Sequence, residues 1–136
     1  GRPRTAVPML RKALSLRREM GEPGNALAAQ SWLGLALSET GEPLQARPLL
    51  EAALSQIAAE GYGGDYPEQE VWWAAYCVLA AAGESARARG CLEQAHRLVE
   101  AQAGRAQSAS LRQAFLEGVP VNRMIERAWQ KAAEET

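Results

Sequence analysis

A fifteen-residue segment recurs after 40 residues, and this repetition restricts the possible folds more than any other feature of the chain. Residues 1–15 read GRPRTAVPMLRKALS and residues 41–55 read GEPLQARPLLEAALS, so that eight of the fifteen positions are identical. One amphipathic helix cannot bury its apolar face alone, whereas similar helix pairs stacked in series can. The repeat therefore predicts an all-α protein assembled from consecutive helix pairs.

Composition and punctuation support the same prediction. Alanine, the best helix former, occupies 27 of the 136 positions, while the strand-favouring residues valine, isoleucine and threonine are scarce. Glycine and proline recur between segments of about 16 to 18 residues, which is the length of a helix rather than of a strand. We predict helices over residues 3–20, 25–40, 43–60, 67–82, 85–103, 108–117 and 120–133.

Several residues mark the expected ends of these helices. Asn25 and Ser85 are suited to the N-cap position, where a short polar side chain accepts a hydrogen bond from a free backbone N–H. Pro43 and Pro67 suit a first helical turn, where the missing N–H is not needed. The Gly-Val-Pro sequence at 118–120 interrupts the apolar periodicity of the C-terminal segment, so we expect two short helices separated by a break.

The repeated unit occurs a third time from Gly83, and the segments before the second and third units also match each other. Residues 30–37 read QSWLGLAL and residues 72–79 read WWAAYCVL. These residues resemble the tetratricopeptide repeat, whose first helix carries W-x2-L-G-x2-Y and whose second helix carries small residues, as Ala46 and Ala53 are here. The period of 40 to 42 residues exceeds the usual length of about 34, which implies helices roughly one turn longer.

The resemblance implies a right-handed solenoid of antiparallel helix pairs. Residues 1–103 would supply the second helix of one repeat and two full repeats, and residues 104–136 a C-terminal capping helix pair of the same domain. The C-terminal segment is also similar to the closing segment of long-repeat solenoids in bacterial signalling regulators, where the solenoid senses signals and binds partners. Because Gly1 aligns with the turn inside a helix pair, we expect the chain to be a fragment of such a longer protein.

Two adjacent tryptophans identify the expected binding face. A helix directs the side chains of Trp72 and Trp73 about 100° apart. The resemblance places Trp72 toward the core and Trp73 on the concave surface where such repeats hold peptides. Trp73 is then an aromatic anchor for a ligand, or alternatively it packs against the next helix, and both interpretations fit the high average burial of tryptophan. The predicted face for a peptide or protein comprises Ser31, Leu35, Glu39, Glu70, Trp73, Cys77 and Ala81.

No set of residues with catalytic or metal-binding spacing is evident in the sequence. His96 is the only histidine and is predicted to be a surface or hydrogen-bonded helix residue rather than a catalyst. Cys77 and Cys91 are not spaced for a metal or a disulfide framework, and we interpret them as buried structural thiols. Gly63-Gly64 lacks the GK[ST] continuation of a phosphate loop and indicates a flexible loop between repeats. We therefore expect a protein that is not an enzyme and that needs no cofactor and no metal.

Charge and hydropathy exclude two classes of partner. The net charge of −1 argues against binding of nucleic acid, since phosphate contacts require a basic excess. No apolar run approaches the ~18 residues that a transmembrane helix needs, and no signal peptide is recognisable, so we expect a cytoplasmic protein without membrane contact. The expected function is a scaffold that binds a protein or peptide, as the sensor or partner-docking part of a larger bacterial signalling or transcription regulator.

Self-assembly is the alternative function, and the first helix supplies the physical reason. Its preceding partner helix would lie outside the chain, so apolar residues at core spacing would be left in water at a cost of about 25 cal/mol per Å². Exposed apolar patches of this kind mark association sites. The residues expected to form a homodimer contact are Met9, Leu10 and Leu14.

Overall fold

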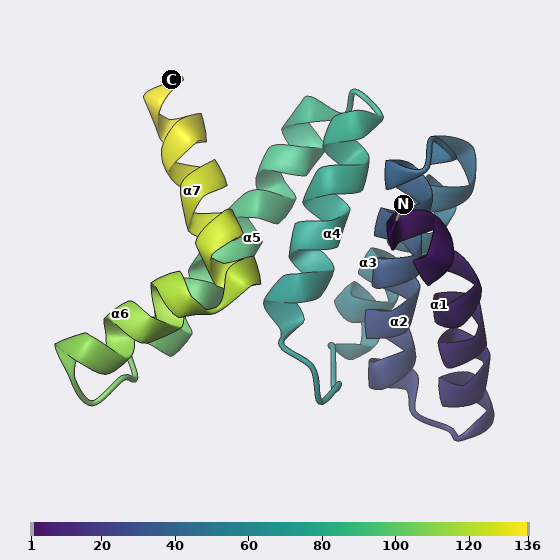
Figure 1. Ribbon diagram of the computed structural model, residues 1–136, viewed down its shortest axis with the longest axis horizontal. Helices are drawn as coiled ribbons and strands as arrows, with labels where there is room; N and C mark the ends of the chain where they lie inside the picture. Colours follow the sequence, from purple (N-terminus) through teal and green to yellow (C-terminus); the bar gives the residue numbers. More distant parts are fainter. Residues whose placement is uncertain (1, 136) are drawn as a thin grey trace.

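The computed structural model describes residues 2–135, and within them the chain forms seven α-helices (Figure 1). These are α1 (Arg2–Glu19), α2 (Pro23–Glu39), α3 (Pro43–Glu60), α4 (Glu68–Ala81), α5 (Ser85–Ala103), α6 (Ala109–Gly118) and α7 (Pro120–Glu134). The all-α prediction is confirmed, and each predicted helix is present with ends that differ by at most two residues from those expected. The helices α1 to α5 pack in sequence and alternate in direction, and α6 and α7 fold back onto α5 (Figure 1).

Three Gly-Glu turns connect α1 to α2, α2 to α3 and α4 to α5 with one shared geometry. Gly21, Gly41 and Gly83 have φ angles of 69°, 83° and 82°, in the left-handed region that favours glycine. In each turn, the N–H of the glutamate that follows donates to a carbonyl five residues earlier and so closes the preceding helix. The repetition in the sequence therefore has a direct counterpart in how these helices end.

The predicted N-caps are wrong. The helix α2 begins two residues before Asn25, and α5 begins at Ser85 itself. The N-cap positions belong to Glu22 and Glu84, neither of which makes a side-chain capping hydrogen bond. Each of these glutamates directly follows a left-handed glycine, so the turn geometry fixes the start of the next helix. Pro43 begins α3 as predicted.

The core divides into two apolar clusters. A first cluster lies among α1 to α5 and consists mainly of alanine and leucine: Leu14, Ala26, Ala29, Leu33, Leu37, Ala46, Leu50, Ala74, Ala75, Val78, Leu79, Ala88 and Cys91. A second cluster joins α5 to α7 and contains Leu92, Ala95, Val99 and Ile125. Within the first cluster, a Cβ at Gly34 would collide with Leu50, so α2 and α3 approach each other closely because glycine has no side chain.

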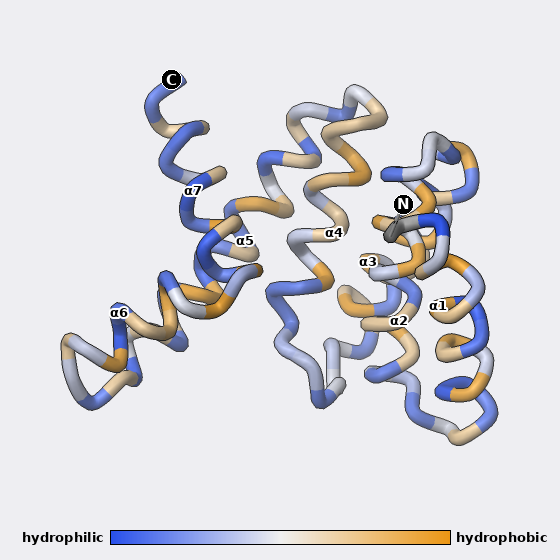
Figure 2. Tube along the Cα trace, viewed as in Figure 1, coloured by the Kyte–Doolittle hydropathy of each residue, from blue (hydrophilic) through white to orange (hydrophobic). Residues whose placement is uncertain are grey.

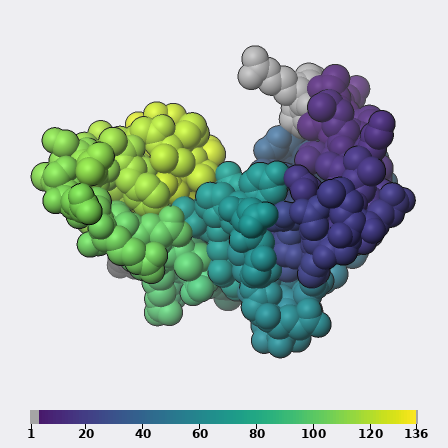
Figure 3. Space-filling model, turned by 90° about the horizontal axis from the view of Figure 1, so that it is seen from below, coloured from purple at the N-terminus to yellow at the C-terminus, as the bar shows by residue number. Residues whose placement is uncertain are grey.

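The hydropathy of the chain and the shape of the molecule agree with this arrangement. Apolar residues run along α2 and α4, while hydrophilic residues gather in the turns and along α7 (Figure 2). Seen from below, the molecule is hollowed between α7 on one side and α1 with α2 on the other, and α4 lies at the base of the hollow (Figure 3). Among residues 2–135, no helix combines the length and apolar character needed to cross a membrane.

Candidate functional site

Four of the residues predicted to bind a partner lie on the less buried sides of α4 and its neighbour α2. Glu70, Trp73 and Cys77 are half-buried and recur at helical spacing, so they share one side of α4. Burial, and next the charge of nearby Glu39 on α2, raise the pKa of the Cys77 thiol to about 12. The thiol therefore stays protonated at neutral pH and is a poor nucleophile. We call Glu39, Glu70, Trp73 and Cys77 the α2–α4 face.

Trp73 has a packed part and an exposed part. Its ring packs against the second cluster and lies 5.3 Å from the ring of Tyr76, with an angle of 36° between the two planes. The side chain is only half-buried, so part of the indole remains accessible. The interpretation that Trp73 packs against a following helix thus agrees with these contacts, and the anchor interpretation stays a prediction for the accessible part.

The other three residues of the predicted face differ in their exposure. Ser31 is fully buried, and its hydroxyl donates a 2.8 Å hydrogen bond to the carbonyl oxygen of Ala28, so it is not available to a ligand. It follows buried Leu27 by one helical turn and therefore shares the inner side of α2. Leu35 is half-buried against the first cluster. Ala81 is exposed but lines a depression of about 530 Å³ that it shares with the N-terminal end of α3.

The loop between α3 and α4, residues 61–67, is held against the start of α2. The Asn25 side-chain amide donates to Asp65 Oδ2 at 3.0 Å, and the backbone N–H of Asp65 donates to Asn25 Oδ1 at 2.8 Å. The backbone of Gly63-Gly64 approaches Gly24 so closely that a Cβ on Gly24 would not fit. The loop that the sequence indicated as flexible is therefore packed on α2 through specific contacts.

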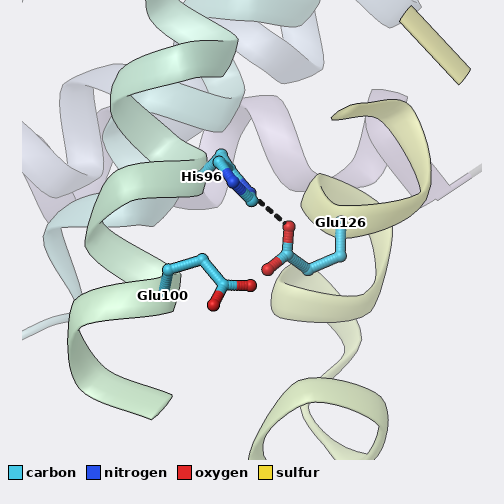
Figure 4. A group of neighbouring side chains, drawn as sticks. All are labelled: His96, Glu100 and Glu126. Carbon is cyan, nitrogen blue, oxygen red and sulfur yellow. Dashed lines mark hydrogen bonds and ion pairs between the residues drawn. The ribbon is translucent and has the colours of Figure 1, made fainter. Parts of the chain in front are cut away.

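A group of titratable side chains that sequence reasoning missed lies where α5 meets α7 (Figure 4). His96 and Glu100 are one helical turn apart on α5, and Glu126 projects from α7. His96 Nδ1 lies 2.5 Å from Glu126 Oε2, and one potential ligand atom from each of the three residues lies within 4.8 Å of the others. Within residues 2–135, this is the one group of three His, Cys, Asp or Glu side chains with such spacing.

Neighbouring side chains orient the His96–Glu100–Glu126 cluster. The indole of Trp129 stacks on the His96 imidazole, with ring centroids 4.7 Å apart and an angle of 13° between the planes. Arg112 of α6 donates a 3.0 Å hydrogen bond to Glu100 Oε2. The three cluster residues and Trp129 line a cavity of about 520 Å³ between α5 and α7. The cluster is thus accessible from this cavity, although each of its side chains is partly buried.

The two carboxyl groups of the cluster differ in their electrostatics. Burial, and next the neighbouring Glu100 carboxyl group, raise the pKa of Glu126 to about 7, while His96 acts in the opposite direction. The pKa of Glu100 is lowered, first by the neighbouring Glu126 carboxyl group and also by Arg112. Oε1 of Glu126 is buried without a hydrogen-bond partner. The arrangement therefore places a buried oxygen of Glu126 beside the Glu100 carboxyl group, and the raised pKa of Glu126 allows the two groups to share a proton.

Only part of this cluster could be found in the sequence. The His96-x3-Glu100 spacing is visible there and places both side chains on one side of a helix. Glu126 lies on another helix beyond the break at 118–120, and only the packing of α7 on α5 brings its carboxyl group to His96.

No protein-family model matches this sequence, and no curated protein or solved structure matches the chain. The structure defines the class as an all-α protein whose antiparallel helices pack in sequence.

Proposed function

We propose that this chain is a non-catalytic protein-interaction module that holds a peptide segment of its partner against the α2–α4 face. The observation that carries the proposal is the hollow between α7 and the α1–α2 pair, with α4 at its base (Figure 3). Trp73 lies on α4 and is half-buried, so we expect a peptide laid along α4 to contact the part of its ring that the second cluster leaves accessible. Buried tryptophan contacts of this kind commonly supply a large share of the binding energy at an interface.

The proposal extends to the architecture, which we infer to be a right-handed solenoid of the tetratricopeptide type. The three Gly-Glu turns of one geometry support it, as does the close approach of α2 and α3 at Gly34. Solenoids of stacked repeats present extended concave surfaces to their ligands. In keeping with the resemblance, the module would serve as the sensor or partner-docking part of a larger bacterial signalling regulator.

The charges on the α2–α4 face indicate the chemistry of the partner. Glu39 and Glu70 are the acidic residues of the α2–α4 face, which also carries the aromatic ring of Trp73. An arginine can pair with a carboxylate and stack on an aromatic ring at the same time. We therefore expect a peptide that carries lysine or arginine next to an apolar residue.

A random peptide library displayed on phage and selected on the full chain provides the test. Selected peptides should combine a basic residue with an apolar neighbour, and Trp73→Ala should weaken their binding at least tenfold in isothermal titration calorimetry, about 1.4 kcal/mol. Leu44→Ala is the control, since Leu44 is 90% exposed and belongs to α3 rather than to the face. The circular dichroism spectrum should show that Trp73→Ala is folded like the wild type. If the selected peptides then bind this variant as tightly as the wild type, the proposal is wrong.

Self-association through α1 is a second candidate function, and an apolar stripe on this helix favours it. Met9, Leu16 and Met20 are 72%, 47% and 66% exposed and recur at helical spacing. Of the residues predicted for the contact, Met9 belongs to this stripe, but Leu10 is half-buried and Leu14 is 6% exposed, both packed in or against the first cluster. Leu14 is therefore not available for a dimer contact, because the packing of α2 on α1 already covers it.

Light scattering at high micromolar concentration tests the second candidate. The wild-type chain should have the molar mass of a dimer. The double variant Met9→Glu/Leu16→Glu should have that of a monomer, because it places charge on the apolar stripe. A wild-type chain that is monomeric at this concentration removes the hypothesis.

A further inference from the structure

The His96–Glu100–Glu126 cluster presents one imidazole and two carboxylates to a common point (Figure 4). Neutral imidazole and carboxylate groups together suit divalent first-row ions such as Zn²⁺, and a set of three protein ligands leaves a further position for water. Zn–N and Zn–O bonds of about 2.0–2.2 Å at tetrahedral angles separate neighbouring ligand atoms by roughly 3.4 Å. The ligand atoms of the cluster already lie within 4.8 Å of one another, so small side-chain rotations suffice to reach this geometry.

We propose that His96, Glu100 and Glu126 bind one divalent transition-metal ion of the Zn²⁺ type and that the ion links α7 to α5. The ion replaces the direct contact between His96 Nδ1 and Glu126 Oε2, which now spans 2.5 Å and would lengthen to admit it. Both contacting atoms then become ligands of the same ion.

A second observation indicates that a proton or a cation lies between Glu126 and Glu100. Oε1 of Glu126 is buried and has no hydrogen-bond partner, which is unusual because buried carboxyl oxygens are normally paired. In Figure 4 the carboxyl groups of Glu126 and Glu100 face each other across a short gap. Two carboxylates in such proximity repel each other unless a proton or a cation lies between them. A divalent cation held by Oε2 of Glu126 and by Glu100 places positive charge beside the unpaired Oε1 and offsets the repulsion between the two carboxylates.

The surroundings of the cluster are suited to hold ligands in place. Stacking on Trp129 restrains rotation of the His96 ring, and Arg112 hydrogen bonds to Oε2 of Glu100 while leaving Oε1 for the ion. Hydrogen-bonded neighbours of this kind commonly orient metal ligands. The cavity of about 520 Å³ beside the cluster gives an ion access and has room for the water that completes its coordination.

Metal titration of the full chain tests the site. After treatment with EDTA and dialysis, the protein should bind one Zn²⁺ per chain in competition with a chromophoric chelator. Glu126→Gln and His96→Gln should each weaken this affinity at least tenfold, because each removes a ligand. Glu117→Gln is the matched control, since Glu117 lines the same cavity but is not part of the cluster, and its affinity should equal that of the wild type.

Substitution of Co²⁺ for Zn²⁺ gives a readout that does not depend on the variants being folded. Co²⁺ bound by nitrogen and oxygen ligands should show visible absorption bands without the intense near-ultraviolet band of a thiolate ligand. The proposal is overturned if the wild-type chain binds neither ion, which would leave the cluster as a direct contact between His96 and Glu126. A thiolate band, which would assign the ion to Cys77 or Cys91, or equal affinity in Glu126→Gln and wild type, also overturns it.

Discussion

The two apolar clusters of this protein are built in different ways. In the first cluster, the buried side chains are almost all alanine and leucine, and α2 meets α3 where Gly34 faces Leu50. Beside the second cluster, polar side chains are buried as deeply as apolar ones, with Gln69 and Asn122 only 1% and 0% exposed. Side-chain size thus dominates the packing of the first region, where the buried polar residues Asn25, Gln30 and Ser31 all belong to α2. In the second region, paired polar groups from several helices help to specify the packing.

The polar groups near the second cluster form one amide network across four helices. The Gln69 and Gln102 side chains exchange hydrogen bonds of 3.2 and 3.0 Å, and Gln69 Nε2 also donates to Asn122 Oδ1 at 3.1 Å. Asn122 Nδ2 donates to the carbonyl oxygen of Phe115 at 3.2 Å. Each amide finds its partners on other helices, so only one arrangement of α4, α5, α6 and α7 satisfies them all. Small residues allow α1 to α5 to pack closely, whereas specific polar contacts help to position α6 and α7.

The largest expected effect concerns a buried leucine of the first cluster. Leu50→Ala should lower the free energy of unfolding by about 2–5 kcal/mol, because Leu50 is 0% exposed and its removal leaves a cavity in a tightly packed interface. Urea denaturation followed by circular dichroism measures the change. Leu44→Ala on the same helix is the matched control, since Leu44 is 90% exposed and its truncation should alter stability by no more than about 0.5 kcal/mol. Equal effects of the two substitutions would contradict the packing described for α3.

The amide network offers the corresponding test of the second region. Asn122→Ala should lower the free energy of unfolding by about 1–3 kcal/mol, because it removes one of the two acceptors of the buried Gln69 amide and the donor to the Phe115 carbonyl. Gln130→Ala truncates an exposed amide on the same helix and should have little effect. Hydrogen exchange provides a second measurement: the loss of protection should be greatest in α6 and α7. Uniform loss over all helices would show that the network does not act locally.

Close backbone approach gives a third contrast. Gly24→Ala should lower the free energy of unfolding by about 1–3 kcal/mol, because its Cβ would meet the backbone of Gly63-Gly64 and push the 61–67 loop away from α2. Gly90→Ala should instead raise stability by up to about 1 kcal/mol, since nothing lies near a Cβ there and alanine favours the helix. Thermal unfolding of both variants decides the sign. If Gly24→Ala is also stabilising, the loop does not need this contact.

The same contrast explains what the sequence could predict. Glycine and proline at the turns identified most of the helix ends, because local backbone geometry decides where a helix ends. The inner orientation of Ser31 was missed, since the repeat pattern alone does not fix how α2 is rotated against its neighbours. The contact between His96 and Glu126 was missed for a related reason: it depends on the packing of two helices that share no repeat. Pattern reasoning therefore succeeds where residues recur and fails where single polar contacts decide.

Among residues 2–135, two buried side-chain oxygens lack a hydrogen-bond partner: Oε1 of Glu126 near the second cluster, and Oη of Tyr62 in the loop held on α2. The smallest expected effect concerns the ionisation of Tyr62. Burial, and then the charges of Glu70, Glu68 and Asp65, raise the pKa of Tyr62 to about 12. The folded protein therefore holds this phenolic proton more tightly than the unfolded chain, whose tyrosines ionise near pH ~10. By linkage, the stability that Tyr62 contributes is complete below pH ~10 and is lost as the pH rises toward ~12.

Ultraviolet absorbance of the folded chain should show a fraction of its tyrosine that ionises only around pH 12, and Tyr62→Phe should remove that late fraction. The effect on stability is small, because the side chain is partly exposed and solvent screens the neighbouring carboxylates. The unfolded chain in guanidinium chloride is the control, in which the tyrosines should ionise together. A folded chain whose whole absorbance change is complete near pH ~10 would place the Tyr62 hydroxyl in water. The burial described for the Tyr62 hydroxyl in the loop held on α2 would then be wrong.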